Sequence, residues 1–299
     1  MSASGGAGLS GAAGLPALRI MATPDDVADA AAAEIARALE AAIEARGVAY
    51  WATTGGSAAP PIYRRLAAPP VRDTVSWADV QVWWGDDRYV PSDHPESNVL
   101  PLEQVLLASG GDETGSSASS ADVAASGTGV RMPVANLHPI PMAAAIAHGG
   151  GAAWAAAMYE TELRAFGPDP GPDGVPAFDL IVVGVGPDGH LLSVFPGSAA
   201  WDATGLCLAI PAPEHVAPNL DRVTLHPRLL AAARAVLVVT TGAAKAANLV
   251  LAWAPDADVR EIPVAAARIP SATWILDEAA AAGLPREPSP DPSPDPTGA

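Results

Sequence analysis

The sequence FDLIVVGVGPDGHLLSVFPGS, residues 178–198, contains an apolar run over residues 180–185 that only Gly184 interrupts. A run this rich in Val and Ile predicts a strand that is buried on both faces. The glycines and the proline that follow end this strand in a turn that carries Asp188 and His190. An open α/β sheet usually places its chemistry at such a turn, and histidine exchanges a proton near neutral pH. The stretch therefore predicts a sheet strand followed by a candidate catalytic pair.

Helices and strands are predicted to alternate along the rest of the chain. Residues 22–47 combine an N-cap at Thr23, a proline at position 24, a C-cap at Gly47 and an apolar residue at every fourth position, which is typical of a long amphipathic helix. Further strands are expected over 48–53, within 75–91, and over 207–211, 235–240 and 271–277. Further helices are expected after the turn at 53–57 and over 98–108, 152–166, 227–233, 242–253 and 278–282. This alternation predicts an α/β, Rossmann-like fold, in which a mostly parallel sheet carries helices on both faces of a single domain.

The composition of the segments suggests how the chain is organised around that domain. Residues 1–17 lack the basic start and long apolar core of a secretory signal, and we expect them to form a flexible leader. The α/β domain is expected to span residues 18–284. Within it, residues 110–129 are rich in Gly, Ser and Ala without periodicity, which predicts a disordered insertion loop. The Pro-rich residues 285–299 are expected to form a disordered tail.

Charge and cysteine content exclude several classes of function. The 299 residues carry a formal net charge of −17, which argues against nucleic acid as a partner. The chain has no stretch of about 18 apolar residues without charge, so no membrane span is expected. Cys207 is the only cysteine, which excludes an intramolecular disulfide and favours a cytoplasmic protein with a buried thiol. An anionic substrate would need a local positive site against this overall charge, and Lys245 is the only lysine available for it.

Two polar turns after predicted strands are candidates for binding an anion. Gly55, Gly56 and Ser57 allow close backbone approach, and the amides that begin the following helix can hold an anion, although such a turn is also a common plain connector. Arg88, after two aspartates, can offer a planar fork to a phosphate or carboxylate, or simply pair with those acids. The spacing of the acids does not match a metal site, and the usual nucleotide-binding motifs are absent. We therefore expect neither a metal nor a cofactor.

Two further segments complete the set of candidate residues. His190 and Asp188 form the turn described above, for which the alternative is a structural histidine bonded to a backbone carbonyl. Arg222, and Lys245 one helical turn after Gly242, lie just beyond other predicted strands. On its own Lys245 would be interpreted as a solvated helix lysine. Parallel strands end at one edge of a sheet, so these cations are expected near His190.

Taken together, the four segments resemble the 6-phosphogluconolactonase family, within the wider group of sugar-phosphate isomerases and glucosamine-6-phosphate deaminases. That family shows SGGSTP, then D-E-R-x-V-P leading to S-N, then G-x-G-P-D-G-H-T-A-S-L-F-P-G, then R-x-T, G-x-x-K and W-x-x-D. The counterparts in this chain, in the same order over about residues 20–284, are Gly55-Gly56-Ser57, Asp86-Asp87-Arg88 with Ser97-Asn98, residues 179–197, Arg222-Val223-Thr224, Gly242 to Lys245, and Trp274 with Asp277. The departures are Ala58-Ala59 for Thr-Pro, Asp87 for Glu, Leu191-Leu192 for Thr-Ala, and the extra loop 110–129.

The resemblance implies hydrolysis of 6-phospho-D-glucono-1,5-lactone to 6-phospho-D-gluconate, a step of the oxidative pentose phosphate pathway. In this interpretation His190 is the general base for a water molecule, Asp188 orients it or holds a sugar hydroxyl, and Arg88 stabilises the oxyanion. The implied phosphate-binding residues are Gly55, Gly56, Ser57, Arg222 and Lys245. The division of the three cations between phosphate and carbonyl is open. Asp86 and Asn98 are expected to brace the Arg88 loop.

Two other functions share this scaffold and stay open from the residues alone. The first is a sugar-phosphate isomerase or amino-sugar-phosphate deaminase, whose pattern continues G-x-D-G-H-I-A-F-N-E-P. Here Ser193-Val194-Phe195-Pro196 follows instead, without Asn or Glu, which favours the lactonase. The second is a sugar-phosphate sensor, which would normally carry a basic helix-turn-helix that is absent here. The expected partner is a small sugar-phosphate lactone, and a monomer is the expected oligomeric state, which no motif fixes.

Overall fold

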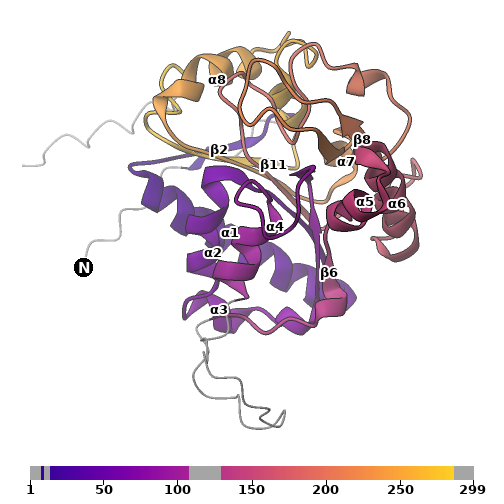
Figure 1. The fold of residues 1–299 in the computed structure, drawn as a ribbon. Coiled ribbons are helices and arrows are strands. Elements are labelled where there is room, and N and C mark those ends of the chain that lie inside the picture. Colours follow the sequence, from indigo (N-terminus) through magenta and orange to yellow (C-terminus); the bar gives the residue numbers. More distant parts are fainter. Residues whose placement is uncertain (1–7, 10–13, 108–128, 286–299) are drawn as a thin grey trace, which may run out of the picture.

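β7 (Leu180–Val183) lies inside an eight-stranded sheet that forms the centre of the molecule (Figure 1). The structure is a computed structural model, and it describes residues 8–9, 14–107 and 129–285. Along the sheet the strands are β1 (Gly8–Leu9), β2 (Ala17–Met21), β11 (Ala272–Asp277), β10 (Val236–Thr240), β7, β3 (Ala49–Thr53), β4 (Val80–Trp84) and β6 (Leu137–His138). Every neighbouring pair is parallel except β1 with β2, which confirms the mostly parallel Rossmann-like sheet.

Helices flank this sheet, and two of them, at residues 71–74 and 142–148, were not predicted from the sequence. The helices are α1 (Pro24–Arg46), α2 (Ala59–Leu66), α3 (Val71–Thr74), α4 (Val99–Pro101), α5 (Met142–His148), α6 (Gly151–Phe166), α7 (Arg228–Ala232) and α8 (Ala246–Trp253). Figure 1 shows α1 beside α2, α5 beside α6 on the right, and α8 at the top. In the parts of the chain that the structure describes, no helix combines the length and the apolar character needed to cross a membrane.

The first helix forms where its capping residues predict it. Thr23 and Asp26 make reciprocal side-chain-to-backbone hydrogen bonds, a capping box that satisfies amides at the helix start. Gly47 ends the helix with φ of 76°, a left-handed conformation that glycine adopts without steric cost. Val27, Ile35 and other residues of the apolar stripe are buried against the sheet. The prediction for this helix is therefore confirmed at both ends.

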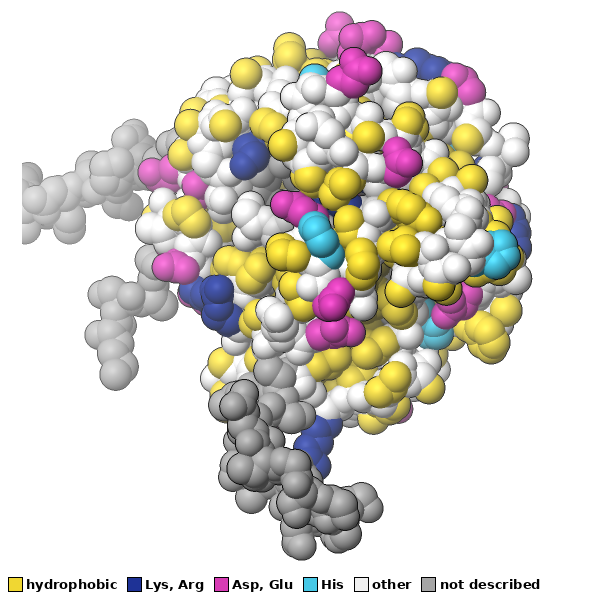
Figure 2. Space-filling model, in the orientation of Figure 1, with side chains coloured by type: hydrophobic (Ala, Val, Ile, Leu, Met, Phe, Trp, Pro, Cys, Tyr) yellow, Lys and Arg dark blue, Asp and Glu magenta, His cyan; other side chains and the backbone are white. Residues whose placement is uncertain are grey.

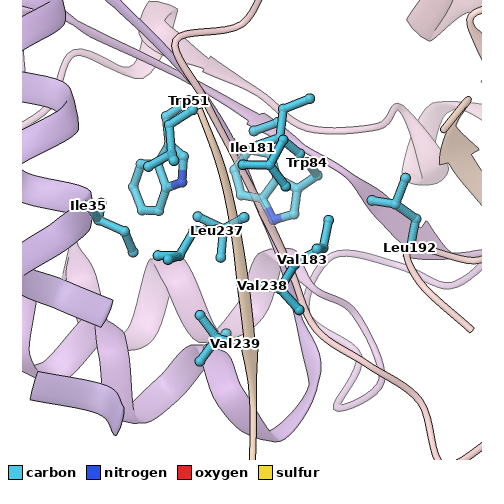
Figure 3. Packing of buried hydrophobic residues seen from close by; sticks show 14 of the residues in the cluster. Ile35, Trp51, Trp84, Ile181, Val183, Leu192, Leu237, Val238 and Val239 are labelled. Carbon is cyan, nitrogen blue, oxygen red and sulfur yellow. The ribbon is translucent and has the colours of Figure 1, made fainter. Parts of the chain in front are cut away.

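Large apolar side chains fix the central strands. All four residues of β7 are at most 1% exposed, as expected for a strand that is buried on both faces. Figure 3 shows Ile181 and Val183 packed among Trp51, Leu237 and Val238, with further strand and helix side chains around them. Burial of a Val or Leu side chain contributes about 1.5–3 kcal/mol. The turn after β7 thus follows directly from a strand that is fully buried in the core.

A second, smaller sheet was not expected from the sequence. Its three antiparallel strands are, in spatial order, β5 (Asp86–Arg88), β9 (Arg222–Leu225) and β8 (Cys207–Ile210). The strand predicted over 207–211 therefore exists, but it belongs to this second sheet. Cys207 is buried and free, in agreement with its predicted character.

Other boundaries also differ from the predictions. The helix expected over 278–282 is wrong: these residues form turns, because the left-handed Gly283, with φ of 90°, ends the segment after a single turn. The helix expected over 98–108 is α4 followed by a π-helical turn, Leu102–Leu106. The one expected over 242–253 starts with a 3₁₀ turn before α8.

The expected leader and loops are described only in part. Within residues 1–17, Gly8–Leu9 form β1 at the sheet edge instead of belonging to a free leader, and Ala17 starts β2. Most of the rest of the leader, and most of the insertion loop and tail, lie outside the described residues, at residues 1–7, 10–13, 108–128 and 286–299.

Candidate active site

The turn after β7 brings Asp188 and His190 into direct contact. The His190 amide donates to Asp188 Oδ1 at 3.2 Å, and the Gly186 amide donates to the His190 carbonyl at 2.9 Å. This tight turn places His190 Nδ1 2.5 Å from Asp188 Oδ1. A Cβ on Gly186 would lie 2.0 Å from the imidazole, so only glycine leaves room for the ring there. The structure therefore has the direct aspartate–histidine bond that the sequence left open.

A cavity of about 440 Å³ lies beside this turn. β10, β7 and β3 are neighbours in the sheet, so the turns at their carboxyl ends meet at one edge. The sequence-predicted residues that line the cavity are Gly55, Gly56, Ser57, Arg88, His190, Arg222 and Lys245. Asp188 does not line it but contacts His190 from behind. All of the candidate residues are thus brought together at one place.

Arg88 and Arg222 enter the cavity from the second sheet. They are directly opposite each other on the antiparallel strands β5 and β9, an arrangement in which like charges destabilise a sheet. Burial lowers the pKa of Arg222, and the neighbouring Arg88 lowers it further, while Asp86 acts in the opposite direction. The Nε atoms of both arginines are buried without a hydrogen-bond partner among the described residues. Two guanidinium groups with unused donors suit a bound anion.

The segment before Arg88 is braced by buried carboxyl groups. Asp87 accepts from the amides of Arg88 and Asn98 at 2.8 and 2.7 Å and from the Ser97 hydroxyl at 3.1 Å. Burial raises the pKa of Asp87 to about 7, against these hydrogen bonds, which lower it. Asp86 accepts from the Ser193 hydroxyl at 2.6 Å. These contacts fix the backbone that carries Arg88.

The loop at residues 54–58 and Lys245 line the cavity beside the turn after β7. A Cβ on Gly55 would lie 1.8 Å from Asn98 Oδ1, so the loop packs directly on the braced segment. Gly56 begins a 3₁₀ turn that leads into α2. Lys245 is half-buried, and its Nζ donates to the Thr241 carbonyl at 3.1 Å. Lys245 is therefore a component of the cavity and not a fully solvated helix lysine.

Two residues at the site were not predicted to belong to it from the sequence. His215, from the segment between β8 and β9, lines the cavity and places its Nε2 2.8 Å from Asp188 Oδ2. Leu192 also lines the cavity. Its φ is 54°, and no other non-glycine residue in the described ranges has a positive φ. Leu191, the departure nearest to His190 in sequence, is instead fully buried in the core.

The site combines local positive charge with an acidic surface. Figure 2 shows Asp and Glu side chains spread over the visible face, with only a few Lys and Arg among them. The cavity nevertheless contains both Arg88 and Arg222 as well as the single lysine. Among the described residues, no group of three or more His, Cys, Asp or Glu side chains is placed to hold a metal ion.

A Rossmann-like sheet with a cationic cavity and a histidine–aspartate pair at its carboxyl edge defines an α/β protein whose site is suited to an anionic small molecule. A family model described as glucosamine-6-phosphate isomerases/6-phosphogluconolactonase matches residues 22–275. The chain belongs to this family.

Individual relatives agree with that assignment. The 6-phosphogluconolactonase of Streptomyces coelicolor is 32% identical over 87% of this chain and 91% of its own length. That of Mycobacterium tuberculosis is 32% identical over 90% and 98%. The solved structure of 6-phosphogluconolactonase from Trypanosoma brucei superposes with a TM-score of 0.74 at 26% identity, covering 90% of this chain and 99% of that chain. A monomeric glucosamine-6-phosphate deaminase, 14% identical with a TM-score of 0.67 and covering 89% and 98%, shares the fold alone.

Proposed function

We propose that this chain hydrolyses 6-phospho-D-glucono-1,5-lactone to 6-phospho-D-gluconate. The observation that carries the proposal is the 2.5 Å contact between Asp188 and His190 at the edge of a cavity that also contains two arginines and a lysine. The relatives named 6-phosphogluconolactonase cover nearly the whole chain and support the same reaction. An acyl-transfer reaction on an anionic substrate requires the groups that this cavity combines.

His190 is the general base of the proposed reaction. Because Nδ1 is engaged by Asp188, Nε2 is the nitrogen that takes a proton from the attacking water. The water oxygen bonds to C1 of the lactone, and the carbonyl electrons move to its oxygen. As the carbonyl re-forms, the bond from C1 to the ring oxygen breaks, and His190 returns the proton to that oxygen. A positioned base of this kind contributes about 10²–10⁴-fold in rate.

The cations divide the negative charges of the substrate between them. Arg88, held by the Glu96 carbonyl at 2.7 Å, is assigned to the oxyanion that develops at C1. Arg222, Lys245 and the Gly55-Gly56-Ser57 loop are assigned to the phosphate, for which backbone amides and cations are suitable donors. The position of both arginines in the lining of one cavity, directly opposite each other on paired strands, supports an anion-binding role for both.

The first test measures lactone hydrolysis by the wild type and by His190→Ala. Freshly generated 6-phosphogluconolactone is used, the product is detected with 6-phosphogluconate dehydrogenase, and spontaneous hydrolysis is subtracted. The variant is expected to lose about 10²–10⁴-fold in kcat. His148→Ala is the matched control, because His148 stacks on Trp154 at the end of α5 and does not line the cavity.

The outcomes separate the reaction from its mechanism. Acceleration that is lost in His190→Ala and kept in His148→Ala supports both. If His190→Ala still accelerates hydrolysis, the proposed reaction is supported but His190 is not its general base. A folded wild type that leaves the lactone at its spontaneous rate, but releases ammonia from glucosamine 6-phosphate, would contradict the proposed reaction.

A further inference from the structure

We propose that His215 is a positioning residue that holds the Asp188 carboxylate in register with His190, an inference that rests on the proposed function of the cavity. His215 comes from the segment between β8 and β9, 27 residues beyond Asp188. Its Nε2 lies 2.8 Å from Asp188 Oδ2, while His190 Nδ1 lies 2.5 Å from Oδ1. One carboxylate thus bridges two imidazoles, each through its own oxygen.

The chemistry of these groups fixes the direction of both hydrogen bonds. An ionised carboxylate only accepts hydrogen bonds, so each histidine donates through the nitrogen that faces it. His215 therefore carries a proton on Nε2, and His190 carries one on Nδ1. Burial raises the pKa of Asp188, but the hydrogen bonds and charge of His190, together with His215, outweigh it and hold the pKa well below its usual range. Asp188 is consequently ionised whenever the two imidazoles contact it.

A second donor restricts a motion that a single donor leaves open. A carboxylate that is bound at one oxygen can turn about its side-chain torsions, whereas a contact at each oxygen selects one orientation. Asp188 is mostly buried, with its side chain 15% exposed, while the side chain of His215 is 54% exposed. His215 therefore closes the solvent side of the pair and keeps Oδ1 directed at His190.

Phe195 joins the two histidines on their other side. Its ring centroid lies 4.6 Å from that of His190 and 5.7 Å from that of His215, the latter in an edge-to-face arrangement. The guanidinium carbon of Arg222 lies 5.1 Å from the same ring. His215 also lines a second, largely apolar cavity of about 710 Å³ to which Phe195 belongs, so it forms part of the partition between the two cavities. The ring contacts give His215 a defined orientation although its segment is exposed.

Two substitutions of His215 distinguish the role of its hydrogen-bond donor from the role of its aromatic ring. His215→Phe keeps an aromatic ring against Phe195 and removes the hydrogen bond to Asp188. His215→Gln removes the ring and keeps an amide donor with a reach similar to that of Nε2. If His215 positions Asp188, the Phe variant loses about tenfold in kcat with KM changed less than about twofold, the size expected for one lost charge-assisted hydrogen bond. The Gln variant keeps most of the activity.

The Asp188→Asn background tests whether the effect passes through the carboxylate. Adding His215→Phe to Asp188→Asn is expected to cost less than about twofold, because the ionised acceptor is already gone. A full additional tenfold loss in the double variant would overturn the proposal. So would wild-type kcat in His215→Phe, or a loss in His215→Gln as large as that in His215→Phe.

A measurement that does not use activity distinguishes this proposal from the proposed function. Long-range ¹H–¹⁵N spectra of the full chain report the tautomer of each neutral histidine, with signals assigned through His190→Gln and His215→Gln. The expected result is Nδ1–H for His190 and Nε2–H for His215, with mixed tautomers for His190 in His215→Phe. A His215 that carries its proton on Nδ1 overturns the proposal even in an active lactonase. If the expected tautomers are found in a protein that has no lactonase activity, the contact between His215 and Asp188 is supported and only the proposed reaction is rejected.

Discussion

Asp87, in the segment at residues 85–88 after β4, and Asp188, in the turn at residues 184–190 after β7, have carboxyl groups with opposite surroundings. Asp87 is 1% exposed and accepts from two backbone amides and a hydroxyl, all neutral donors. Asp188 contacts two imidazoles, both of which can carry charge. Burial raises the pKa of Asp87 to about 7, while the imidazoles hold that of Asp188 far below its usual value.

The difference shows what each aspartate can contribute. A carboxyl group that burial drives toward its neutral form is suited to hold a backbone in place, and Asp87 holds the amides of Arg88 and Asn98. A carboxylate that stays ionised next to a histidine stabilises the imidazolium that forms when the histidine takes a proton. The two aspartates thus divide into a structural brace and a candidate member of the proton-transfer site.

The largest effect on kcat is expected when Asp188 is replaced by asparagine, and the same replacement at Asp87 is the comparison. Asp188→Asn is predicted to lower kcat for lactone hydrolysis by about 10²–10⁴-fold, because an amide neither fixes the His190 tautomer nor stabilises its imidazolium. Asp87→Asn, the matched control, is predicted to change kcat less than about threefold, since its oxygen still accepts from both amides. Equal losses in the two variants would remove the distinction between brace and proton-transfer group.

The pH dependence of stability tests the Asp87 side of the comparison. Its folded-state pKa is raised above the ordinary value of 3.8, so the folded protein holds this proton more tightly than the unfolded chain. The contribution of Asp87 to stability is therefore complete below about pH 4 and is lost as the pH rises through about 7. Between pH 5 and pH 8 the wild type should lose up to about 3 kcal/mol relative to Asp87→Asn, at 1.36 kcal/mol per pH unit.

The measurement is urea unfolding of both proteins at several pH values. Comparing the two proteins cancels the contributions of the remaining titratable groups, which they share. A constant difference in unfolding free energy from pH 5 to pH 8 would show that Asp87 titrates normally, and the contrast with Asp188 would then rest on geometry alone.

The two segments also differ in how far their sequences predict them. The β7 strand and its turn are predictable because a doubly buried strand needs a continuous apolar run, and glycines mark where it ends. The α1 helix is predictable for a similarly local reason, since Thr23 and Gly47 are its caps. Such features depend only on residues that are close in the chain.

The unpredicted features depend on contacts between distant residues. β5 is three residues long and polar, so no apolar alternation marks it, and it becomes a strand only by pairing with β9. That pairing sets Arg88 against Arg222, which no local pattern encodes. His215 lies in an irregular segment with no periodicity.

The smallest expected effect tests how closely the β7 turn must fit the histidine ring. A Cβ on Gly186 would lie 2.0 Å from His190, so Gly186→Ala should displace the ring from Asp188 and lower kcat about 10-fold, up to about 10²-fold if the shift reaches 1 Å. Gly171→Ala is the control outside the cavity, because a Cβ there meets only the Val175 carbonyl, at an ordinary 3.7 Å. If both variants keep wild-type kcat, the contact between His190 and Asp188 does not limit catalysis, and the ionised state of Asp188 has no use in the proposed reaction. A loss of kcat that is confined to Gly186→Ala instead shows that the rate depends on the position of the His190 ring.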